Sequence, residues 1–334
     1  MEIRYPKYYK DFVCIAADCP DSCCKEWGVD VDDVAAAYYR SLSGPLGDRL
    51  REVLQDTDSG TIMTIEDGRC PMWRADGLCR IQAELGEAAL CKTCRDFPRL
   101  RHDYGDFVEL GLELSCPEAA RIILSQKRRD WIAETSPEAG CPEYDPDVMA
   151  SLLRSRDEFQ TFLDCTPLPF PQILTVLLLH VHDLQEELDG GEQAVLLPDA
   201  LLADAQQFVC SGSIGVLQDF FAGLEILTPR WKSLLKAEPV ASQWDDRHRA
   251  LLRYFIDRYW LQAVSDFDIL CRGKFMVAAC LLTAHLGENF ADVAQLFSKE
   301  IENDPDNMET ILDGAYTAPA LTDTNLLYLL MGGM

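Results

Sequence analysis

The chain has 334 residues, 48% of them hydrophobic, which is enough to bury one large core or two modest ones without disulfide support. Its formal net charge of −26 argues against binding to the phosphate backbone of nucleic acid. It contains no run of about 20 apolar residues, so we expect no membrane association. The N-terminal segment MEIRYPKYYK lacks an apolar leader, and the sequence therefore predicts a cytoplasmic protein.

The first part of the chain is predicted to mix short helices and strands. Asp30 or Asp32 can cap a helix that runs to about Leu42. The apolar segment Thr61–Ile65 precedes Asp67-Gly68 and resembles a strand that enters a turn. A second turn signal, Asp76-Gly77, predicts a small hairpin around Cys70 and Cys79.

Residues 107–127 are predicted to form a strand followed by a helix. Phe107–Leu114 alternates apolar and other residues over several positions, as a short strand does. Ser115 and Glu118 have the spacing of a capping box, with Pro117 near the first helical position, so we expect a helix toward Lys127.

The composition changes near residue 135, where the segment Thr135–Asp147 is rich in proline, glycine and acid and is interpreted as a linker. It separates a Cys-rich metal-binding domain, residues 1–134, from an α-helical domain, residues 148–334. Helical periodicity is found at Val148–Asp164, Pro171–Leu188, Ala200–Leu227, Asp246–Val264, Phe267–Leu286, Val293–Ile301 and Leu321–Met331. The predicted fold is mainly α, with a small Cys-rich N-terminal subdomain containing short β-hairpin elements packed on an α-helical C-terminal body.

Nine of the fourteen cysteines lie within the first part of the chain. Disulfides are rare in a reducing compartment, and thiolate is the soft ligand that zinc, copper(I) and iron–sulfur clusters prefer. We therefore predict a metal site, most simply an iron site, and its candidate ligands are Cys14, Cys19, Cys23, Cys24, Cys70, Cys79, Cys91, Cys94 and Cys116.

Nine thiols exceed the four or so protein ligands of one zinc ion or one [4Fe–4S] cluster. The sequence leaves two alternatives, two metal centres or one centre with spare core cysteines. Cys23 and Cys24 are adjacent, and neighbouring side chains of an extended chain point to opposite faces. They would then serve different centres, or one of them would be a packing residue.

Four cations follow Cys91 closely in the sequence CKTCRDFPRLR. They would lower the pKa of nearby thiols, offset the charge of a cluster or hold a substrate carboxylate, unless they are ordinary surface residues. The other cysteines have no partner at ligand spacing and are expected to be small buried hydrophobes: Cys141, Cys165, Cys210, Cys271 and Cys280.

Several catalytic motifs are absent from the sequence. There is no C-x3-C-x2-C, because Glu26 stands where the third cysteine would follow Cys19 and Cys23. There is also no G-x-G-x-x-G after a predicted strand, no P-loop and no H-E-x-x-H. No methyl-donor, nucleotide or zinc-protease site is therefore identified from a motif.

Four N-terminal segments carry a family resemblance: RYPKYYKDFVC, CPDSCCKEWGVDVD, GRCPMWRADGLCRIQAELGEAALCKTCRDFPR and LSCPEAARIIL. In the order and spacing of the nine cysteines they resemble the flagellin lysine N-methylase family, which has a CxxCxxCC-type zinc- or iron-chelating signature. The resemblance is dense over residues 4–124. It is looser over residues 246–287, where RYFIDRYWLQAVSDFDILCRGKFMVAACLL is similar to the family's helical tail.

The resemblance implies a protein lysine N-methyltransferase that methylates ε-amino groups of flagellin lysines. It also implies an iron–sulfur cluster, [4Fe–4S] with zinc as the alternative, and S-adenosylmethionine as the methyl donor. The nine named cysteines match the family's pattern. The partner would be flagellin or another lysine-rich protein, toward which the acidic second half of the chain would steer; the alternative is that this acid forms an ordinary solvated surface.

Methyl transfer to lysine requires a neutral amine, because the ammonium ion has no lone pair. A general base or a desolvating pocket would remove the proton, and the candidates near the cysteines are Tyr5, Tyr8, Tyr9, Glu26 and Asp96. Two other functions remain open, an iron–sulfur or zinc module for electron transfer without methyl transfer, and a structural zinc site in an interaction scaffold.

Overall fold

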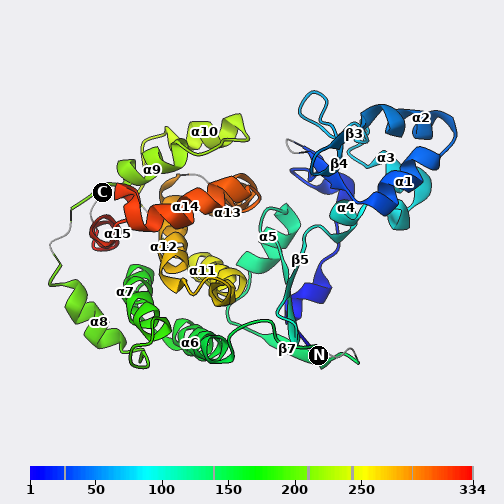
Figure 1. Cartoon of the computed structure of the whole chain (residues 1–334). Coiled ribbons are helices and arrows are strands. Elements are labelled where there is room, and N and C mark those ends of the chain that lie inside the picture. The colour runs from blue at the N-terminus through cyan, green and yellow to red at the C-terminus, as the bar shows by residue number, and fades with distance from the viewer. Residues whose placement is uncertain (26–27, 138–139, 209–210, 242–243, 288, 333–334) are drawn as a thin grey trace.

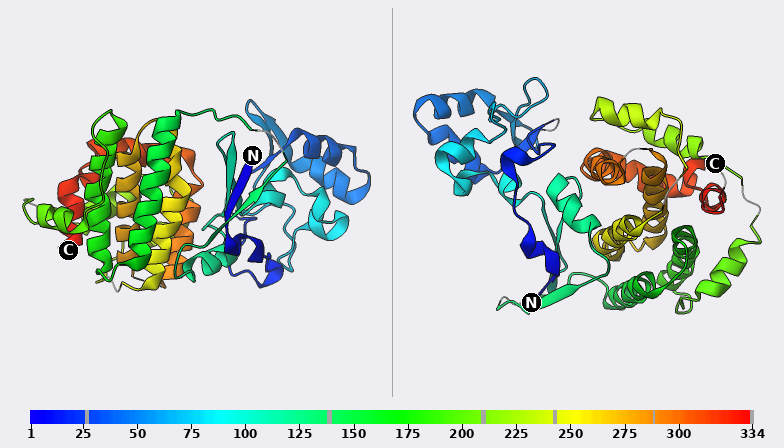
Figure 2. Two further views of the ribbon diagram at one scale, coloured as in Figure 1. Left: turned by 90° about the horizontal axis from the view of Figure 1, so that it is seen from below. Right: turned by 180° about the vertical axis from the view of Figure 1, so that it is seen from behind.

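The fold is taken from a computed structural model, which describes residues 1–334 except 26–27, 138–139, 209–210, 242–243, 288 and 333–334. A small N-terminal lobe and a larger helical body lie on opposite sides of a four-stranded sheet (Figure 1). The N-terminus lies on this sheet and the C-terminus on the far side of the body, as the two turned views also show (Figure 2). No helix among the described residues is both long and apolar enough to cross a membrane.

The four-stranded sheet has the order β5-β6-β1-β7. Strand β1 (Glu2–Pro6) pairs in parallel with β6 (Phe107–Leu112) and antiparallel with β7 (Trp131–Thr135). Strand β5 (Arg99–Asp103) forms an antiparallel hairpin with β6. The N-terminal strand thus lies in the middle of the sheet, between two segments that are more than a hundred residues away along the chain.

The small lobe is built around a three-stranded sheet with the order β2-β4-β3. Strands β3 (Leu54–Thr57) and β4 (Gly60–Met63) form a hairpin, and β2 (Val29–Val31) pairs with β4. The helices of this lobe are α1 (Asp33–Ser41), α2 (Gly44–Val53), α3 (Arg80–Leu85) and α4 (Lys92–Asp96).

Asp32 joins two of these helices, because one carboxylate oxygen accepts from Ala35 N at 3.0 Å and caps α1 while the other accepts from Lys92 N at 2.7 Å. We expect Asp32→Ala to lower the free energy of unfolding by about 1–2 kcal/mol. The backbone N–H of Lys92 is the main cause that lowers the pKa of Asp32. This stabilisation is therefore present above the unfolded pKa of about 4 and is lost as the pH falls through the folded value.

Urea unfolding at neutral pH and in acid measures this contribution. Asp33→Ala, at the exposed next position, is the matched control and is expected to change stability by less than about 0.5 kcal/mol. Equal stability losses in the two variants would contradict the role given to Asp32.

The helical body begins after the sheet and contains most of the chain's helices. Helix α5 (Pro117–Leu124) lies between the sheet and this body. The body's helices are α6 (Pro146–Cys165), α7 (Phe170–Leu188), α8 (Pro198–Ala205), α9 (Ile214–Ala222), α10 (Pro229–Leu235), α11 (Asp246–Tyr259), α12 (Ile269–His285), α13 (Phe290–Phe297), α14 (Pro305–Thr317) and α15 (Asp323–Leu330). Helix α12 is buried on almost every side, as expected for the apolar central helix of a bundle. A π-helical turn, Ser298–Glu302, follows α13.

The described residues form two separate hydrophobic cores. The larger core runs from Phe12 through the sheet and α5 to the helices of the body. The smaller core belongs to the small lobe and includes Tyr39, Leu50 and Met63. The division into domains at residues 134 and 148 stays a prediction; the larger core takes side chains from both of the predicted ranges.

The predicted fold class is confirmed, since the chain is mainly α with small N-terminal sheets and an N-terminal cysteine cluster. The predicted single helix Ala200–Leu227 is wrong. Helix α8 ends at Ala205, and α9 begins after Ser213, whose hydroxyl accepts a hydrogen bond from Val216 N and caps the helix. The backbone N–H of Ser213 donates to Asn325 Oδ1 at 2.9 Å. The side chain of Asn325 lies against Gly212, where a Cβ atom would clash.

Two local predictions were also wrong in detail. The expected capping box does not form, because the Ser115 hydroxyl donates to Glu113 and α5 starts at Pro117 with no side-chain cap. The expected hairpin around Cys70 and Cys79 is reduced to one antiparallel bridge, Trp73–Cys79, and the hairpin of the lobe is β3–β4 instead.

Candidate metal centre

Five of the nine candidate cysteines surround the smaller core. Cys70 and Cys91 are buried in it, and Cys24, Cys79 and Cys94 pack against it with part of their surface exposed. Backbone contacts hold their segments together, because Cys70 N donates to Cys24 O at 2.8 Å. Cys79 stands at the N-terminus of α3, and Cys91 stands at the N-terminus of α4.

Cys91 and Cys94 form a thiol pair on the first turn of α4. The thiol of Cys94 donates to the sulfur of Cys91, which lowers the pKa of Cys91 to about 7 and raises that of Cys94. One thiol of this C-x2-C pair is therefore readily ionised near neutral pH, as a metal ligand must be.

The sulfur of Cys24 contacts the thiols of both Cys23 and Cys70. The thiols of Cys23 and Cys70 both donate to the sulfur of Cys24, which lowers the pKa of Cys24 to about 3. The same contacts raise the pKa of Cys23 and of Cys70. Three sulfurs from two distant segments of the chain therefore meet at Cys24.

The other four cysteines are not among the residues of the smaller core. Cys14 and Cys23 are exposed, Cys19 is half-buried, and Cys116 is buried at the N-terminus of α5. Burial raises the pKa of Cys116 to about 11, although the backbone N–H groups of Ala119 and Glu118 point at its sulfur and oppose this rise. The charges of Cys19 and Cys14 act in the same direction as burial, which places these sulfurs in the neighbourhood of Cys116.

The chemistry of this donor set fits a thiophilic metal. All nine cysteines lie among the described residues. Outside the undescribed segments, however, no three His, Cys, Asp or Glu side chains lie close enough together to enclose a single metal ion. The sulfur contacts that the structure shows are those of Cys23 and Cys70 with Cys24 and of Cys94 with Cys91.

The four cations that follow Cys91 have partners other than the thiols. Lys92 and Arg95 pair with Asp96, and Arg101 pairs with Asp103. The guanidinium of Arg99 lies over the ring of Phe12.

The expectation for the five outlying cysteines is confirmed in part. Cys271 and Cys280 are buried, as expected of small hydrophobes. Cys141 and Cys165 are exposed, so the prediction was wrong for them. Cys210 lies outside the described residues.

The candidates for a general base lie in different surroundings. The Tyr5 hydroxyl donates to Glu134, and Asp96 is engaged by Lys92. Tyr9 is half-buried, and burial raises its pKa. Tyr8 lines a cavity between the sheet and α11, and burial also raises the pKa of its hydroxyl, so it stays protonated at neutral pH. Glu26 lies outside the described residues.

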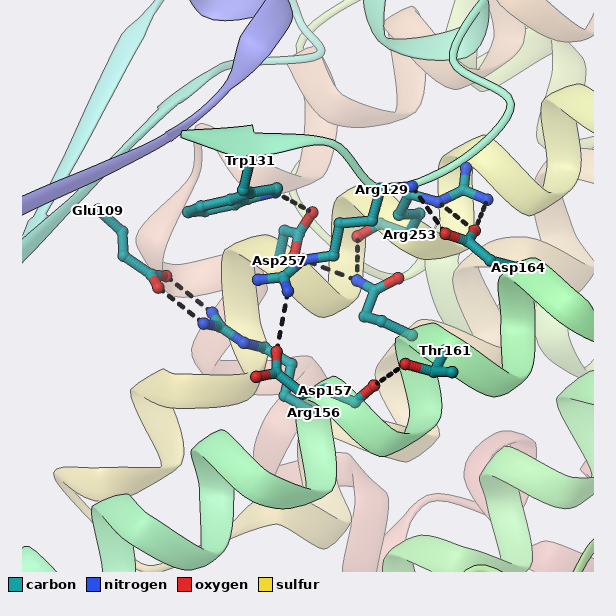
Figure 3. A network of polar contacts seen from close by, with 10 residues as sticks. Glu109, Arg129, Trp131, Arg156, Asp157, Thr161, Asp164, Arg253 and Asp257 are labelled. Atoms are coloured by element: carbon teal, nitrogen blue, oxygen red, sulfur yellow. Dashed lines mark hydrogen bonds and ion pairs between the residues drawn. The ribbon is translucent and has the colours of Figure 1, made fainter. Parts of the chain in front are cut away.

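The structure adds a buried polar network at the seam between the sheet and the helical body (Figure 3). Arg156 of α6 forms two hydrogen bonds of 2.7 Å with the carboxylate of Glu109 on β6, and both side chains are almost fully buried. Asp257 of α11 accepts from Arg129 at 3.0 Å and from Trp131 Nε1 at 3.2 Å. Sequence analysis missed this network, for which the one signal was a glutamate inside an apolar strand.

The cavity next to this network has a volume of about 30 Å³ and is lined by Tyr8, His102, Trp131 and Asp257, among others. At roughly 10–15 Å³ for each buried water, this cavity has room for a few water molecules and not for an adenosyl methyl donor. Its lining carries a buried imidazole nitrogen, His102 Nε2, for which the described residues offer no partner.

Comparison with known proteins finds two lysine-N-methylases and a flagellar biosynthetic protein. The lysine-N-methylases of Salmonella choleraesuis (strain SC-B67) and Salmonella typhimurium (strain LT2) are each 28% identical to this chain over 235 residues, which cover 66% of this chain and 52% of each relative. The flagellar biosynthetic protein FliU of Salmonella muenchen is 33% identical over 133 residues, which cover 37% of this chain and 77% of FliU. No family model and no solved structure matches the chain.

The chain spans about half the length of the lysine-N-methylases that it matches. FliU is matched over most of its own length at a higher identity. On these grounds the chain belongs to the flagellin lysine N-methylase family.

Proposed function

We propose that this chain is a protein lysine N-methyltransferase that acts on the ε-amino groups of flagellin lysines and uses S-adenosylmethionine as its methyl donor. The observation that carries the proposal is the similarity to two lysine-N-methylases over 66% of the chain. The name of the third relative, a flagellar biosynthetic protein, supports flagellin as the substrate. The net charge of −26 favours encounter with a lysine-rich protein.

The proposal includes metal held by the nine N-terminal cysteines, with an iron–sulfur cluster preferred and zinc as the alternative. Thiolates suit both metals. A bound cluster would supply single-electron chemistry and would fix the segments that carry its ligands. Hydrogen bonds from neighbouring thiols lower the pKa of Cys24 and of Cys91, which favours the thiolate form that a metal binds.

The reaction itself sets a requirement on the protein. The lone pair of a neutral lysine nitrogen attacks the methyl carbon, the carbon–sulfur bond of the donor breaks, and the donor leaves as a neutral thioether. The proton of the lysine ammonium must first pass to a base or to water, which burial of the amine favours. Placing the amine in such a site is the part of the reaction that the chain's own residues perform.

The test is methyl transfer by the full-length protein purified without air. Flagellin incubated with the metal-loaded protein and S-adenosylmethionine is expected to gain mass in steps of one methyl group on lysine peptides. The demethylated donor, S-adenosylhomocysteine, is the control and should give no increase.

Parallel analysis of iron, zinc and acid-labile sulfide separates the alternatives. Metal-loaded protein that leaves flagellin unchanged would contradict the proposed reaction. A cluster that cycles between redox states in the same protein would then favour electron transfer. Stoichiometric zinc without iron would favour the interaction scaffold.

A further inference from the structure

The cavity between the four-stranded sheet and α11 has a floor made by two paired strands. Leu100 and His102 of β5 lie opposite Gly111 and Glu109 of β6, and all four residues line the cavity. Residues two apart on a strand share one face of the sheet. Because Glu109 bonds to Arg156 of α6, this is the face that is turned toward the helical body.

Helix α11 and two aromatic side chains complete the lining. Tyr254, Asp257 and Arg258 are spaced so that they share one face of α11, and they line the cavity from the side of the body. Tyr8 and Trp131 also belong to the lining, and Trp131 Nε1 donates to Asp257 at 3.2 Å (Figure 3). The walls are thus mainly aromatic and aliphatic, with a few polar groups.

A second, smaller cavity of about 10 Å³ adjoins the first. The two cavities share five lining residues, namely Pro6, Tyr8, Trp131, Tyr254 and Asp257. The lining of the smaller cavity also includes Arg128 and Asp130, which are exposed in the loop between α5 and β7. The two cavities together therefore run from this surface loop toward His102.

The charged side chains of the lining already have partners. Among the described residues these are three ion pairs, Glu109–Arg156 at 2.7 Å, Asp257–Arg129 at 3.0 Å and Arg258–Glu302 at 3.3 Å. The lining therefore has no spare counter-charge for a cation or an anion. Burial of an uncompensated charge is costly, so the cavity favours a small uncharged ligand.

One polar atom of the lining lacks a partner. His102 Nε2 is buried, and the described residues offer it no hydrogen bond. Buried polar groups are nearly always hydrogen-bonded, so this nitrogen indicates a polar ligand in the cavity. Burial, together with the charge of Arg258, lowers the pKa of His102, and the imidazole is therefore neutral at neutral pH.

The size of the cavity limits that ligand to a few atoms. Room for a few water molecules is about the room taken by the nitrogen and the last one or two carbons of an unbranched alkylamine. The apolar walls suit the carbons, and His102 Nε2 suits the nitrogen. We propose that this cavity receives the ε-amino end of a lysine side chain as the neutral amine, an assignment to substrate that rests on the proposed function.

Such a site would perform the step that methyl transfer requires of the protein. The lysine ammonium leaves its proton in water as it enters, because the cavity offers no free counter-charge. With the imidazole proton on Nδ1, His102 Nε2 accepts from the amine N–H and leaves the lone pair of the amine free to attack. The cavity has no room for the donor, which must therefore present its methyl group at one end of the cavity.

The first test is binding of n-butylamine to the full-length protein, purified without air and carrying ¹³C-labelled histidine. The nuclear magnetic resonance signal of His102, assigned with His102→Gln, is expected to shift in a saturable manner. The branched isomer tert-butylamine, which has similar basicity but is too wide, is the control and should leave the signal unchanged. No shift with n-butylamine would leave water as the only occupant and overturn the proposal, as would equal shifts with the two isomers.

The pH dependence of this binding identifies the form of the amine. The Kd for total amine is expected to fall about tenfold per pH unit between about pH 7 and 9, because the neutral fraction of an amine with a pKa near 10.5 rises by that factor. Burial raises the pKa of Tyr8 and of Tyr254 and lowers that of His102, so these three groups keep their protonation states over this range. The three ion pairs keep their charges as well. A Kd that does not change with pH would show that the ammonium ion binds and would overturn the proposal.

The second test fills the cavity from its floor. A Cβ atom at Gly111 would lie 3.9 Å from Leu100 Cβ, an ordinary contact, so Gly111→Val is expected to fold and to weaken n-butylamine binding by about tenfold or more. Gly215→Val on α9, where the nearest contact is Ser213 Oγ at 3.6 Å, is the matched control and should bind the amine as wild type does. Circular dichroism verifies that both variants are folded.

The same variants connect the site to the substrate. If wild-type protein methylates flagellin, Gly111→Val is expected to lose that activity and Gly215→Val to keep it. Methylation that persists in a Gly111→Val variant unable to bind n-butylamine would overturn the assignment to the substrate lysine. Wild-type protein that binds n-butylamine as predicted but leaves flagellin unchanged would instead refute the proposed reaction, while the amine site would stand.

Discussion

Replacing Arg156 by alanine is expected to lower the free energy of unfolding by about 3–5 kcal/mol. The guanidinium of Arg156 and the carboxylate of Glu109 are 2% and 3% exposed and share two hydrogen bonds of 2.7 Å. Truncating the arginine leaves the buried carboxylate of Glu109 without its paired counter-charge. Urea unfolding followed by circular dichroism measures the loss.

Two further variants show whether the cost comes from the orphaned charge. In the double variant Arg156→Met/Glu109→Leu both charges are gone, and its stability is expected to lie much closer to wild type than that of Arg156→Ala. Arg121→Ala removes a pair with Glu118 of similar length, 2.6 Å, in which the arginine is 68% exposed. Arg121→Ala is expected to lower the free energy of unfolding by less than about 1 kcal/mol. An equally small loss for Arg156→Ala would contradict the stabilising role given to the buried Arg156–Glu109 pair.

Removing metal is expected to release the small lobe while the helical body stays folded. Among the described residues, the smaller core is built from side chains of the small lobe, few of which are large, so it buries little apolar area. Structural thiolate sites supply on the order of 10 kcal/mol of binding energy that is available only to the folded chain. Without metal, residues 29–94 should therefore open far more often than the helices of the body.

Hydrogen exchange followed by mass spectrometry, before and after anaerobic chelation, measures this effect. We expect amide protection to fall by several orders of magnitude in α1, α2 and β4 and to change little in α7 and α12. Adding the metal back is the control and should restore protection in the lobe. Unchanged protection of the lobe after complete metal loss would show that its core is sufficient by itself.

Much of the helical body was readable from sequence because its signals are local. Helices α6, α7 and α12 follow long apolar periodicities, and α1 follows the capping signal of Asp32. These helices depend on contacts within one element and on one buried face, which periodicity reports directly. The break at Ser213 was missed because it depends on Asn325, more than a hundred residues further along the chain.

The four-stranded sheet and the buried polar network could not be predicted from sequence patterns, because both depend on contacts between residues far apart in the chain. Strand β1 pairs with β6 and β7, and neither pairing leaves a mark in the composition of residues 2–6. Glu109 and Arg156 are ordinary charged residues until the fold buries both and brings them together. The energetics of such a pair arise from burial, which local sequence does not encode.

The cysteines show which features the sequence determines and which features depend on the tertiary structure. The sequence by itself determined which nine thiols are candidates, that they exceed one four-ligand site, and which family they resemble. It left open whether Cys23 and Cys24 act together or apart. Only the tertiary structure decided their surroundings, because Lys299 and Gln295 hold the Cys19–Cys23 loop beside Cys116 while Cys24 packs on the smaller core. Which cysteines lie near one another depends on distances between segments far apart in the chain. Those distances are set by packing and buried charge pairs rather than by spacing along the sequence.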